Sequence, residues 1–451
     1  MDDGEYEVNL GGGFIKGIRE GNIFHARGIK YAIGNRFEKP ALLEKWEATL
    51  DGTKPASVCP QLPSRLNFVT GDIIKGYPMS EDCLHLSICA PFNAIETGAR
   101  LPVMVFLHGG AYLSGGGDLD CYNPRALANR GIVSIVVTYR LGIFGFCPIQ
   151  DLCPPNLGLL DQIIALKWVQ RNISHLGGDP KRVTIIGQSV GAYSIFCMMS
   201  CGFAGNLFQR AILHSACFGW PTVPDEKSDI LAQTAGSLLA GRGHSASMED
   251  LLEVQGKVMM DGKRLDVPFA CWPRFGQDPL PELREVEEKL CQAASKCPIL
   301  IGWVKDEGAA FAPMTSSYSY WSRLPLFGSL FASAMIWWSG GQEFIWPSRE
   351  FHQKYIQNGG LSSTFVFQWH PRGSGRRAVH CIDVPFILGS WESWKDAPML
   401  KGEGSQETIQ RVGDQVKDLW AAFIRGEIVN KHLREWNESK ANGLEDGAGD
   451  P

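Results

Sequence analysis

The pentapeptide Gly187-Gln188-Ser189-Val190-Gly191 constrains the fold of this 451-residue chain more than any other feature. It follows a short β-rich run at residues 183–186 and precedes a segment of helix-compatible composition. A strand that turns sharply into a helix holds its central residue in a strained conformation, and flanking glycines leave room for the neighbouring backbone. G-x-S-x-G in this setting is typical of a nucleophile elbow, with a surface Gly/Ser turn as the alternative. We therefore expect Ser189 to stand exposed above a sheet.

Strands and helices alternate along the chain. Residues 101–107 and 131–138 are apolar, β-rich runs that suit strands buried on both faces. Apolar residues between 159 and 173 recur at helical spacing, and a Gly-Gly-Asp-Pro sequence stops that helix. Further strands are predicted at 211–213, 298–303 and 363–369. This order predicts an α/β fold, with a central, mostly parallel twisted sheet flanked by helices and ligands at the carboxyl ends of its strands.

The chain is long enough for several domains, but its pattern favours one. We expect a single domain over residues 1–437, with helical cap insertions at about 221–297 and 312–360, where the sequence is less regular and contains tryptophans. Residues 438–451 are polar and glycine-rich, so we expect a disordered tail.

Composition limits the partners. Hydrophobic residues make up 44% of the chain, the formal net charge is -5, and no long basic block occurs, which argues against nucleic acid or an anionic membrane surface. No secretory signal and no apolar run long enough for a membrane span is visible. The 13 cysteines are spread irregularly without a C-x-x-C pair, so we expect buried thiols, no metal and no cofactor. These features favour a cytoplasmic protein, with a secreted mature form as the alternative.

A serine hydroxyl is a weak nucleophile, so a catalytic Ser189 needs a base, an orienting acid and N–H donors for an oxyanion. The segment His108-Gly109-Gly110-Ala111 follows the strand at 101–107, and its small residues let the backbone approach a substrate oxygen. The amide of Val190, directly after the serine, is the other expected donor. Phosphate binding is the alternative for this loop, but the G-K-[ST] ending and the G-x-G-x-x-G spacing are missing.

The acid and the histidine should follow the serine in that order. His380 lies in a basic, turn-like stretch before Val384-Pro385-Phe386, which suits a loop that reaches over the site, whereas His370 and His432 fit structural or solvated roles. Among many carboxylates, the Asp306-Glu307 pair directly follows the strand predicted at 298–303. Periodicity does not decide which carboxylate points inward, and a solvated turn is the alternative.

With these motifs the chain resembles the type-B carboxylesterases, the carboxylesterase and cholinesterase branch of the α/β hydrolases. Residues 11–220 match closely, and from 221 onward the match thins to islands at 301–308, the strand to Trp369, 380–386 and 416–423. The resemblance implies an α/β-hydrolase fold and hydrolysis of carboxylic esters. The matching blocks include residues 24–32, 80–86, the His108 loop, 139–142, 156–162, 177–180 and the serine pentapeptide.

Carried over by position, the resemblance implies a catalytic triad of Ser189, Glu307 and His380. It also implies an oxyanion hole that is built from backbone amides, those of Gly110, Ala111 and Val190.

The resemblance assigns a supporting role to one neighbouring residue, and three others depart from the family pattern. Ser215 matches a buried serine that supports the catalytic histidine. Gln188 stands where the family usually has glutamate, which removes a charge beside the site. Val190 replaces the usual alanine, and its β-branched side chain narrows the floor of the hole. Asp383 replaces the longer glutamate that is common three residues after the histidine.

The resemblance also implies structural contacts away from the chemistry. Two of them are ion pairs that pin loops around the sheet, and one is a disulfide of exported relatives that stays as thiols in a reducing compartment. The pairs are Arg36 with Glu81, Arg140 with Asp179, and Cys59 with Cys83.

These features predict two-step acyl transfer on a small-molecule ester. Trp220 sits where relatives form the acyl pocket, and Trp303, Phe311, Tyr320 and Trp321 are candidates for an aromatic wall, with core packing as the alternative. Such a pocket fits a bulky apolar or aryl ester or a lactone. Amide or lactam hydrolysis and acyl transfer to an alcohol remain alternatives, and a catalytically silent interaction module is disfavoured because all triad positions are filled.

Overall fold

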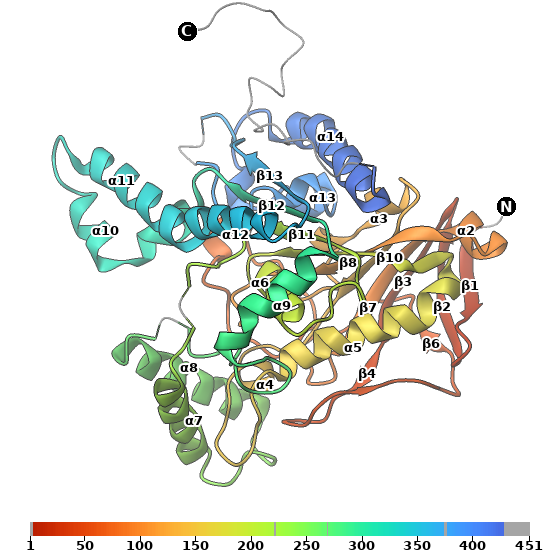
Figure 1. The fold of residues 1–451 in the computed structure, drawn as a ribbon, viewed down its shortest axis with the longest axis horizontal. Helices are drawn as coiled ribbons and strands as arrows, with labels where there is room; N and C mark the ends of the chain where they lie inside the picture. The colour runs from red at the N-terminus through yellow and green to blue at the C-terminus, as the bar shows by residue number, and fades with distance from the viewer. Residues whose placement is uncertain (1–2, 221, 268, 374–376, 428–451) are drawn as a thin grey trace, which may run out of the picture.

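The computed structural model describes residues 3–220, 222–267, 269–373 and 377–427, so the expected tail at 438–451 lies outside the described residues. Its centre is an 11-stranded sheet in the order β1-β2-β3-β7-β9-β8-β10-β11-β12-β13, with β6 beside β2 (Figure 1). Strands β9, β8, β10, β11, β12 and β13 run parallel, whereas β1, β2, β3 and β7 pair antiparallel at one end. The predicted α/β fold with a mostly parallel sheet is confirmed.

The parallel strands lie close to the predicted runs. The exception is β10, which begins five residues earlier than the β-rich run, at Gly178. Their bounds are β8 (Leu101–Leu107), β9 (Val133–Val137), β10 (Gly178–Gln188), β11 (Arg210–His214), β12 (Ile299–Val304) and β13 (Ser362–Phe367). The antiparallel part comprises β1 (Gly4–Asn9), β2 (Phe14–Glu20), β3 (Ile23–Lys30) and β7 (His85–Pro91) with β6 (Leu50–Asp51), and β4 (Ala32–Ile33) pairs separately with β5 (Ala41–Leu42).

Helices cover both faces of the sheet (Figure 1). One face holds α5 (Leu157–Asn172), α6 (Val190–Ser200) and α9 (Val286–Ala294). The other face holds α3 (Arg125–Ala128) and the long α14 (Ser405–Arg425). Shorter helices are α1 (Asn67–Thr70), α2 (Phe92–Thr97), α4 (Gly142–Gly145) and α13 (Trp391–Trp394).

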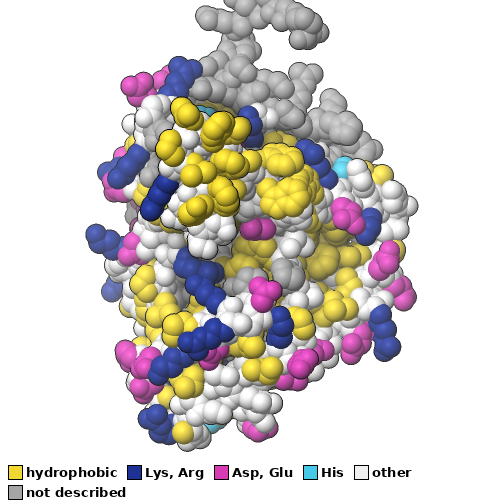
Figure 2. Space-filling model, turned by 90° about the vertical axis from the view of Figure 1, so that its left-hand side faces the viewer, with side chains coloured by type: hydrophobic (Ala, Val, Ile, Leu, Met, Phe, Trp, Pro, Cys, Tyr) yellow, Lys and Arg dark blue, Asp and Glu magenta, His cyan; other side chains and the backbone are white. Residues whose placement is uncertain are grey.

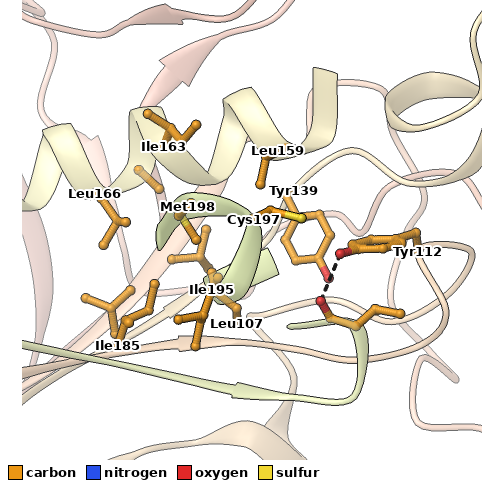
Figure 3. Packing of buried hydrophobic residues seen from close by; sticks show 14 of the residues in the cluster. Leu107, Tyr112, Tyr139, Leu159, Ile163, Leu166, Ile185, Ile195, Cys197 and Met198 are labelled. Carbon is orange, nitrogen blue, oxygen red and sulfur yellow. Dashed lines mark hydrogen bonds between the residues drawn. The ribbon is translucent and has the colours of Figure 1, made fainter. Parts of the chain in front are cut away.

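The core on the α5 side is a continuous apolar layer (Figure 3). Leu107 and Ile185 point from β8 and β10 toward Leu166 on α5 and Ile195 on α6, and all four side chains are fully buried. Strands buried on both faces need apolar residues at successive positions, which explains why these runs do not alternate with polar residues. The rigid layer fixes the strand ends where β8 and β10 meet α6.

A buried ion pair corrects one expectation. Arg140 bonds Asp161 on α5, with Nη2 2.7 Å from Oδ1, and both side chains are almost fully buried. Asp179 bonds Arg100 instead. The reason is topological: Arg140 follows the carboxyl end of β9, whereas Asp179 opens the parallel strand β10 and so lies at the opposite edge of the sheet.

The resemblance implied two other contacts, an ion pair and a pair of cysteines. Arg36 bonds Glu81, as predicted, with Nε 2.8 Å from Oε2. Cys59 and Cys83 are both buried free thiols.

Two groups of helices project beyond the carboxyl side of the sheet. The first is α7 (Asp225–Leu239) with α8 (Met248–Arg264), and the second is α10 (Ser316–Trp321) with α11 (Gly328–Gly340), followed by α12 (Trp346–Gln357). Figure 2 views the face that these two groups share and shows a hollow between them, with hydrophobic side chains inside and dark blue basic side chains at its edge. The hairpin of α10 and α11 also exposes apolar side chains, including Leu326, Phe327, Leu330, Trp337 and Trp338.

Candidate active site

Ser189 occupies the turn between β10 and α6, and its backbone has a φ of 57°. The turn needs glycine on both sides: a Cβ at Gly187 would lie 2.3 Å from the backbone of Gly191, and one at Gly191 would lie 2.2 Å from the carbonyl oxygen of Leu107. A non-glycine residue with positive φ is strained and persists only where the surroundings fix it. The strained strand-to-helix turn therefore matches the expected elbow. The serine is only 3% exposed, so it lies under other residues instead of standing open above the sheet.

The loop after β8 brings free backbone amides to the same place. Gly110 and Ala111 both have positive φ, and a Cβ at Gly110 would lie 1.9 Å from the carbonyl oxygen of Ser114. Among the described residues, the amides of Gly110, Ala111 and Val190 donate no hydrogen bond. Unpaired amides at a strand end and a helix start are suited to bind an anionic oxygen.

Buried side chains hold this loop in position. The hydroxyl of Tyr112 donates to the carbonyl of Val190 at 3.0 Å, which ties the loop to the start of α6. The His108 ring stacks on Tyr139 with centroids 4.3 Å apart, and the Tyr139 hydroxyl donates to the His108 carbonyl at 2.7 Å. Burial lowers the pKa of His108 to about 4, so its imidazole is neutral at neutral pH and adds no charge beside the amides.

Glu307 and His380 form a fully buried pair. Nδ1 of His380 lies 2.5 Å from Oε2 of Glu307, and Oε1 of Glu307 accepts from the backbone N–H of Val304 at 2.9 Å. The two loops that carry the pair are joined, because the Asp306 amide donates to the carbonyl of Ala378 at 3.0 Å. Both carboxylate oxygens therefore have partners, and the histidine ring is fixed with Nε2 facing the serine turn.

The surroundings of His380 favour its protonated form. Burial lowers the pKa of His380, but the sulfur of Cys381 and the carboxylate of Glu307 together outweigh burial and raise that pKa well above its ordinary value. The rings of Phe311 and Phe344 cover the imidazole, with centroid distances of 5.1 and 4.9 Å. The imidazole is thus a stronger base than an exposed histidine.

Gln188 contacts the imidazole atom that a serine base would use. Its Nε2 lies 3.1 Å from Nε2 of His380 and 3.3 Å from the sulfur of Cys381. Among the described residues, Oγ of Ser189 has no hydrogen-bond partner. The structure therefore brings Ser189, Gln188 and His380 together, but the amide of Gln188, rather than the serine hydroxyl, bonds Nε2.

A second buried histidine pair lies behind the site, and sequence reasoning missed it. Nδ1 of His214 lies 2.6 Å from Oδ2 of Asp383, and Nε1–H of Trp420 donates to Nε2 of His214 at 2.9 Å. The two partners of His214 lie far from it in sequence, so spacing gave no signal. Ser215, the expected support of the histidine, follows at the end of β11, and its buried Oγ has no hydrogen-bond partner among the described residues.

A cavity of about 1010 Å³ opens beside the amide loop. Gly110 and Ala111 form part of its wall together with Trp220 and Phe311, so the cavity reaches the free amides. The ring of Trp220 stacks on Phe269 with centroids 3.9 Å apart. Trp220 and Phe311 therefore line this cavity, and their role as an acyl pocket stays a prediction.

The remaining aromatic candidates lie elsewhere. Trp303 is buried in β12 at 4% exposure, in agreement with core packing. Tyr320 and Trp321 are 66% and 44% exposed and do not line this cavity. They belong to α10, which points away from the sheet toward solvent, so the aromatic wall is smaller than expected.

Two kinds of feature are absent from the described residues. No group of three or more His, Cys, Asp or Glu side chains in these ranges could hold a metal ion. Within the same ranges, no helix is long and apolar enough to cross a membrane.

The sheet order, the strained serine at the end of β10 and the histidine–carboxylate pair at the ends of later strands define the α/β-hydrolase class. A model of the carboxylesterase family matches residues 5–323, and the chain therefore belongs to that family. This membership makes the protein a carboxylic ester hydrolase, and hydrolases of this family act on small molecules.

Relatives agree over nearly the whole length. The chain is 35% identical over 420 residues to a probable N-octanoylanthranilate hydrolase of Rhodococcus erythropolis, with 91% of each chain covered. It is 30% identical over 448 residues to the para-nitrobenzyl esterase of Bacillus subtilis (strain 168), covering 92% of this chain and 88% of that one. Among solved structures, a thermophilic PNB esterase aligns with a TM-score of 0.80 and 29% identity, over 96% of this chain and 93% of the other.

Proposed function

We propose that the protein hydrolyses carboxylic esters through an acyl-enzyme, with Ser189 as nucleophile, His380 as base and Glu307 as the acid that orients the base. The observation that carries this proposal is the fully buried Glu307–His380 bond of 2.5 Å, whose imidazole faces the strained serine turn. A buried carboxylate without a catalytic or structural partner would be costly, whereas here it fixes one imidazole tautomer. This geometry supports the roles of Ser189 as nucleophile, His380 as base and Glu307 as orienting acid.

In the first step His380 takes the proton of Ser189 as Oγ attacks the ester carbonyl, and the alcohol leaves with that proton. The amides of Gly110, Ala111 and Val190 hold the oxyanion of each tetrahedral intermediate. Water then attacks the acyl carbonyl and gives a proton to His380, which passes it to Oγ of Ser189 as the acyl–oxygen bond breaks and the acid leaves. The unpaired state of these amides supports this assignment.

The side chain of Gln188 has to move away from Nε2 of His380 before the first proton transfer. Its amide is bonded to Nε2 of His380, the atom that accepts the serine proton. A rotation of the Gln188 side chain frees Nε2 for Ser189, and binding of substrate in the covered site is the event that we expect to drive it.

Residues from both predicted insertions line the cavity, so we propose that they act as a cap over one catalytic domain. The first insertion, 221–297, contributes Met259 and Phe269, and the second, 312–360, contributes Met314 and Glu343. A largely apolar cavity of about 1010 Å³ fits a bulky apolar or aryl ester or a lactone.

We also propose an intracellular location. All 13 cysteines of the chain are free thiols, and most of them are buried. Thiols persist in reducing compartments. Mass measurement of the native protein with and without a thiol reagent would test this, and a disulfide between Cys59 and Cys83 would contradict it.

Amide hydrolysis is the second candidate, and one observation favours it. The Rhodococcus erythropolis relative is named for N-octanoylanthranilate, in which the acyl group is bound to nitrogen. The same triad supports both reactions. Rates on an octanoyl phenyl ester and on the matched octanoyl anilide would rank the two, and we expect the ester to react faster.

The direct test is Ser189→Ala. We expect the variant to fold and to lose turnover of a short-chain p-nitrophenyl ester by a factor of about 10³ or more. Circular dichroism would check the fold. Undiminished turnover would remove Ser189 from the mechanism.

A further inference from the structure

Charged side chains are few in the wall of the cavity, and cations prevail among them. Arg65 and Lys263 line it together with the single carboxylate of Glu343. The whole chain has the opposite balance, with 48 acidic and 43 basic residues. The positive lining is therefore a local feature and does not follow from the average composition.

Neither cation has an anionic partner in the part of the chain that the structure describes, and neither donates a hydrogen bond there. Nearby cations of α8 are paired: Arg264 bonds Asp261 at 2.7 Å, and Lys257 bonds Glu253 at 2.6 Å. The same helix thus supplies acidic partners for residues that face away from the cavity and none for Lys263. Unpaired cations at a cavity are available to an anionic ligand.

The guanidinium of Arg65 is held against the aromatic wall. Its Cζ lies 5.7 Å from the centroid of Phe269, and Phe269 stacks on Trp220. Burial lowers the pKa of Arg65, yet a guanidinium stays charged at any physiological pH. Because Arg65 is exposed and has no carboxylate partner among the described residues, its guanidinium is available to pair with a bound anion.

Glu343 lies at the other end of the same stack. Its Oε2 accepts from Nε1–H of Trp220 at 3.0 Å, and its Oε1 accepts from the hydroxyl of Ser339 at 2.8 Å. Both oxygens are therefore occupied. The residue that follows, Phe344, covers His380. The cavity is thus negative on the side of the catalytic histidine and positive toward Arg65 and Lys263, which are both exposed to solvent at its mouth.

We propose that Arg65 and Lys263 bind a carboxylate on the leaving group of the substrate, so the protein prefers esters that join an apolar acyl chain to an anionic alcohol or phenol. The acyl chain lies against Trp220 and the carbonyl oxygen at the amides of Gly110 and Ala111. Glu343 repels the carboxylate from the catalytic end, so the leaving group extends toward the mouth. This inference rests on the proposed ester hydrolysis and adds the substrate class.

The test compares two octanoyl esters of equal size, that of 3-hydroxybenzoate and that of its neutral analogue 3-hydroxybenzamide. We expect kcat/KM to be higher for the carboxylate ester by about tenfold, the effect of one good charge-assisted contact. In Arg65→Gln and in Lys263→Gln this ratio should fall severalfold, because kcat/KM for the carboxylate ester falls more than kcat/KM for the amide-bearing ester. Arg65→Lys should retain part of the ratio, since it keeps the charge but loses the planar fork.

Arg264→Gln is the matched control, because this cation neighbours Lys263 in sequence but is 2.7 Å from its own partner Asp261. It should leave the ratio unchanged. Equal kcat/KM for both esters in the wild type, or a ratio that survives both substitutions, would overturn the inference. An equal fall of the ratio in Arg264→Gln would also overturn it, because the preference would then arise from the general positive charge of this region and not from a binding site. If the wild type hydrolysed neither ester, the proposed function itself would fail.

Discussion

The ends of the parallel strands and the cap around the cavity differ in how they hold their residues. At the strand ends, Ser189 and Glu307 are almost fully buried and fixed by backbone pairing or by hydrogen bonds to both carboxylate oxygens. Lys263 of the cap and Arg65, which lines the same cavity, are exposed and have no anionic partner among the described residues. Tightly fixed residues suit the bond-breaking step, and unpaired residues suit the choice of substrate. We therefore expect substitutions at strand ends to abolish the chemistry and substitutions in the cap to change preference.

The largest effect is expected at the serine turn. In Gly191→Ala the added methyl group would lie 2.2 Å from the carbonyl oxygen of Leu107, and backbone atoms cannot move aside cheaply. We expect the free energy of unfolding to fall by about 3 kcal/mol or more, with loss of activity. Denaturant unfolding measures the change.

Gly256→Ala is the matched change in the cap. A Cβ at this position in α8 meets nothing within 4 Å, so the alanine should stabilise the protein by about 0.5–1 kcal/mol through helix propensity. Similar losses in both variants would contradict the distinction between the two regions.

The next effect is expected at the buried acid. Glu307→Gln keeps the size of the side chain but removes the charge that fixes the tautomer of His380, so kcat should fall by about 10³–10⁴. Because Glu307 also raises the pKa of His380, the remaining activity should have its acid limb at lower pH than the wild type. Stopped-flow or steady-state rates across pH measure both. A wild-type acid limb below about pH 6.5 would contradict a raised pKa.

A smaller effect is expected at Gln188. Gln188→Glu places a carboxylate about where the amide now lies, 3.1 Å from Nε2 of His380, and so stabilises the imidazolium. The pKa of His380 should rise further, and the base is then neutral only at higher pH. The acid limb of kcat/KM should move up by about one pH unit. An unchanged limb, or one that moves down, would show that Gln188 does not contact the base in solution.

Much of the catalytic end could be predicted from sequence, because parallel strands bring their carboxyl ends to one edge. Ser189 and the Asp306-Glu307 pair each follow an apolar run closely, so the pattern placed them at the same edge, and the resemblance to the family selected Glu307 from the pair. His380 follows its strand at a greater distance, and its loop is fixed by the bond between the Asp306 amide and Ala378, which no pattern reveals. There the resemblance to the family supplied the assignment.

The errors have physical causes of the same kind. Arg140 was assigned to Asp179, although the amino end of β10 is far from the carboxyl end of β9 in a parallel sheet; the true partner, Asp161, faces inward from α5. The His214–Asp383 bond joins residues 169 apart, so no local spacing could indicate it. Tyr320 and Trp321 were candidates for a wall because they are aromatic, but α10 turns them outward.

The measurement that tests the account most directly is the site of covalent labelling by a fluorophosphonate, which reacts with an activated serine. Tandem mass spectrometry of the labelled, digested protein should locate one adduct on the peptide that contains Ser189, and labelling should be lost in Ser189→Ala. The rate of labelling should also fall in Glu307→Gln, because His380 is no longer oriented by the carboxylate. An adduct on another residue, or full esterase activity in a protein that does not label at Ser189, would contradict the proposed nucleophile.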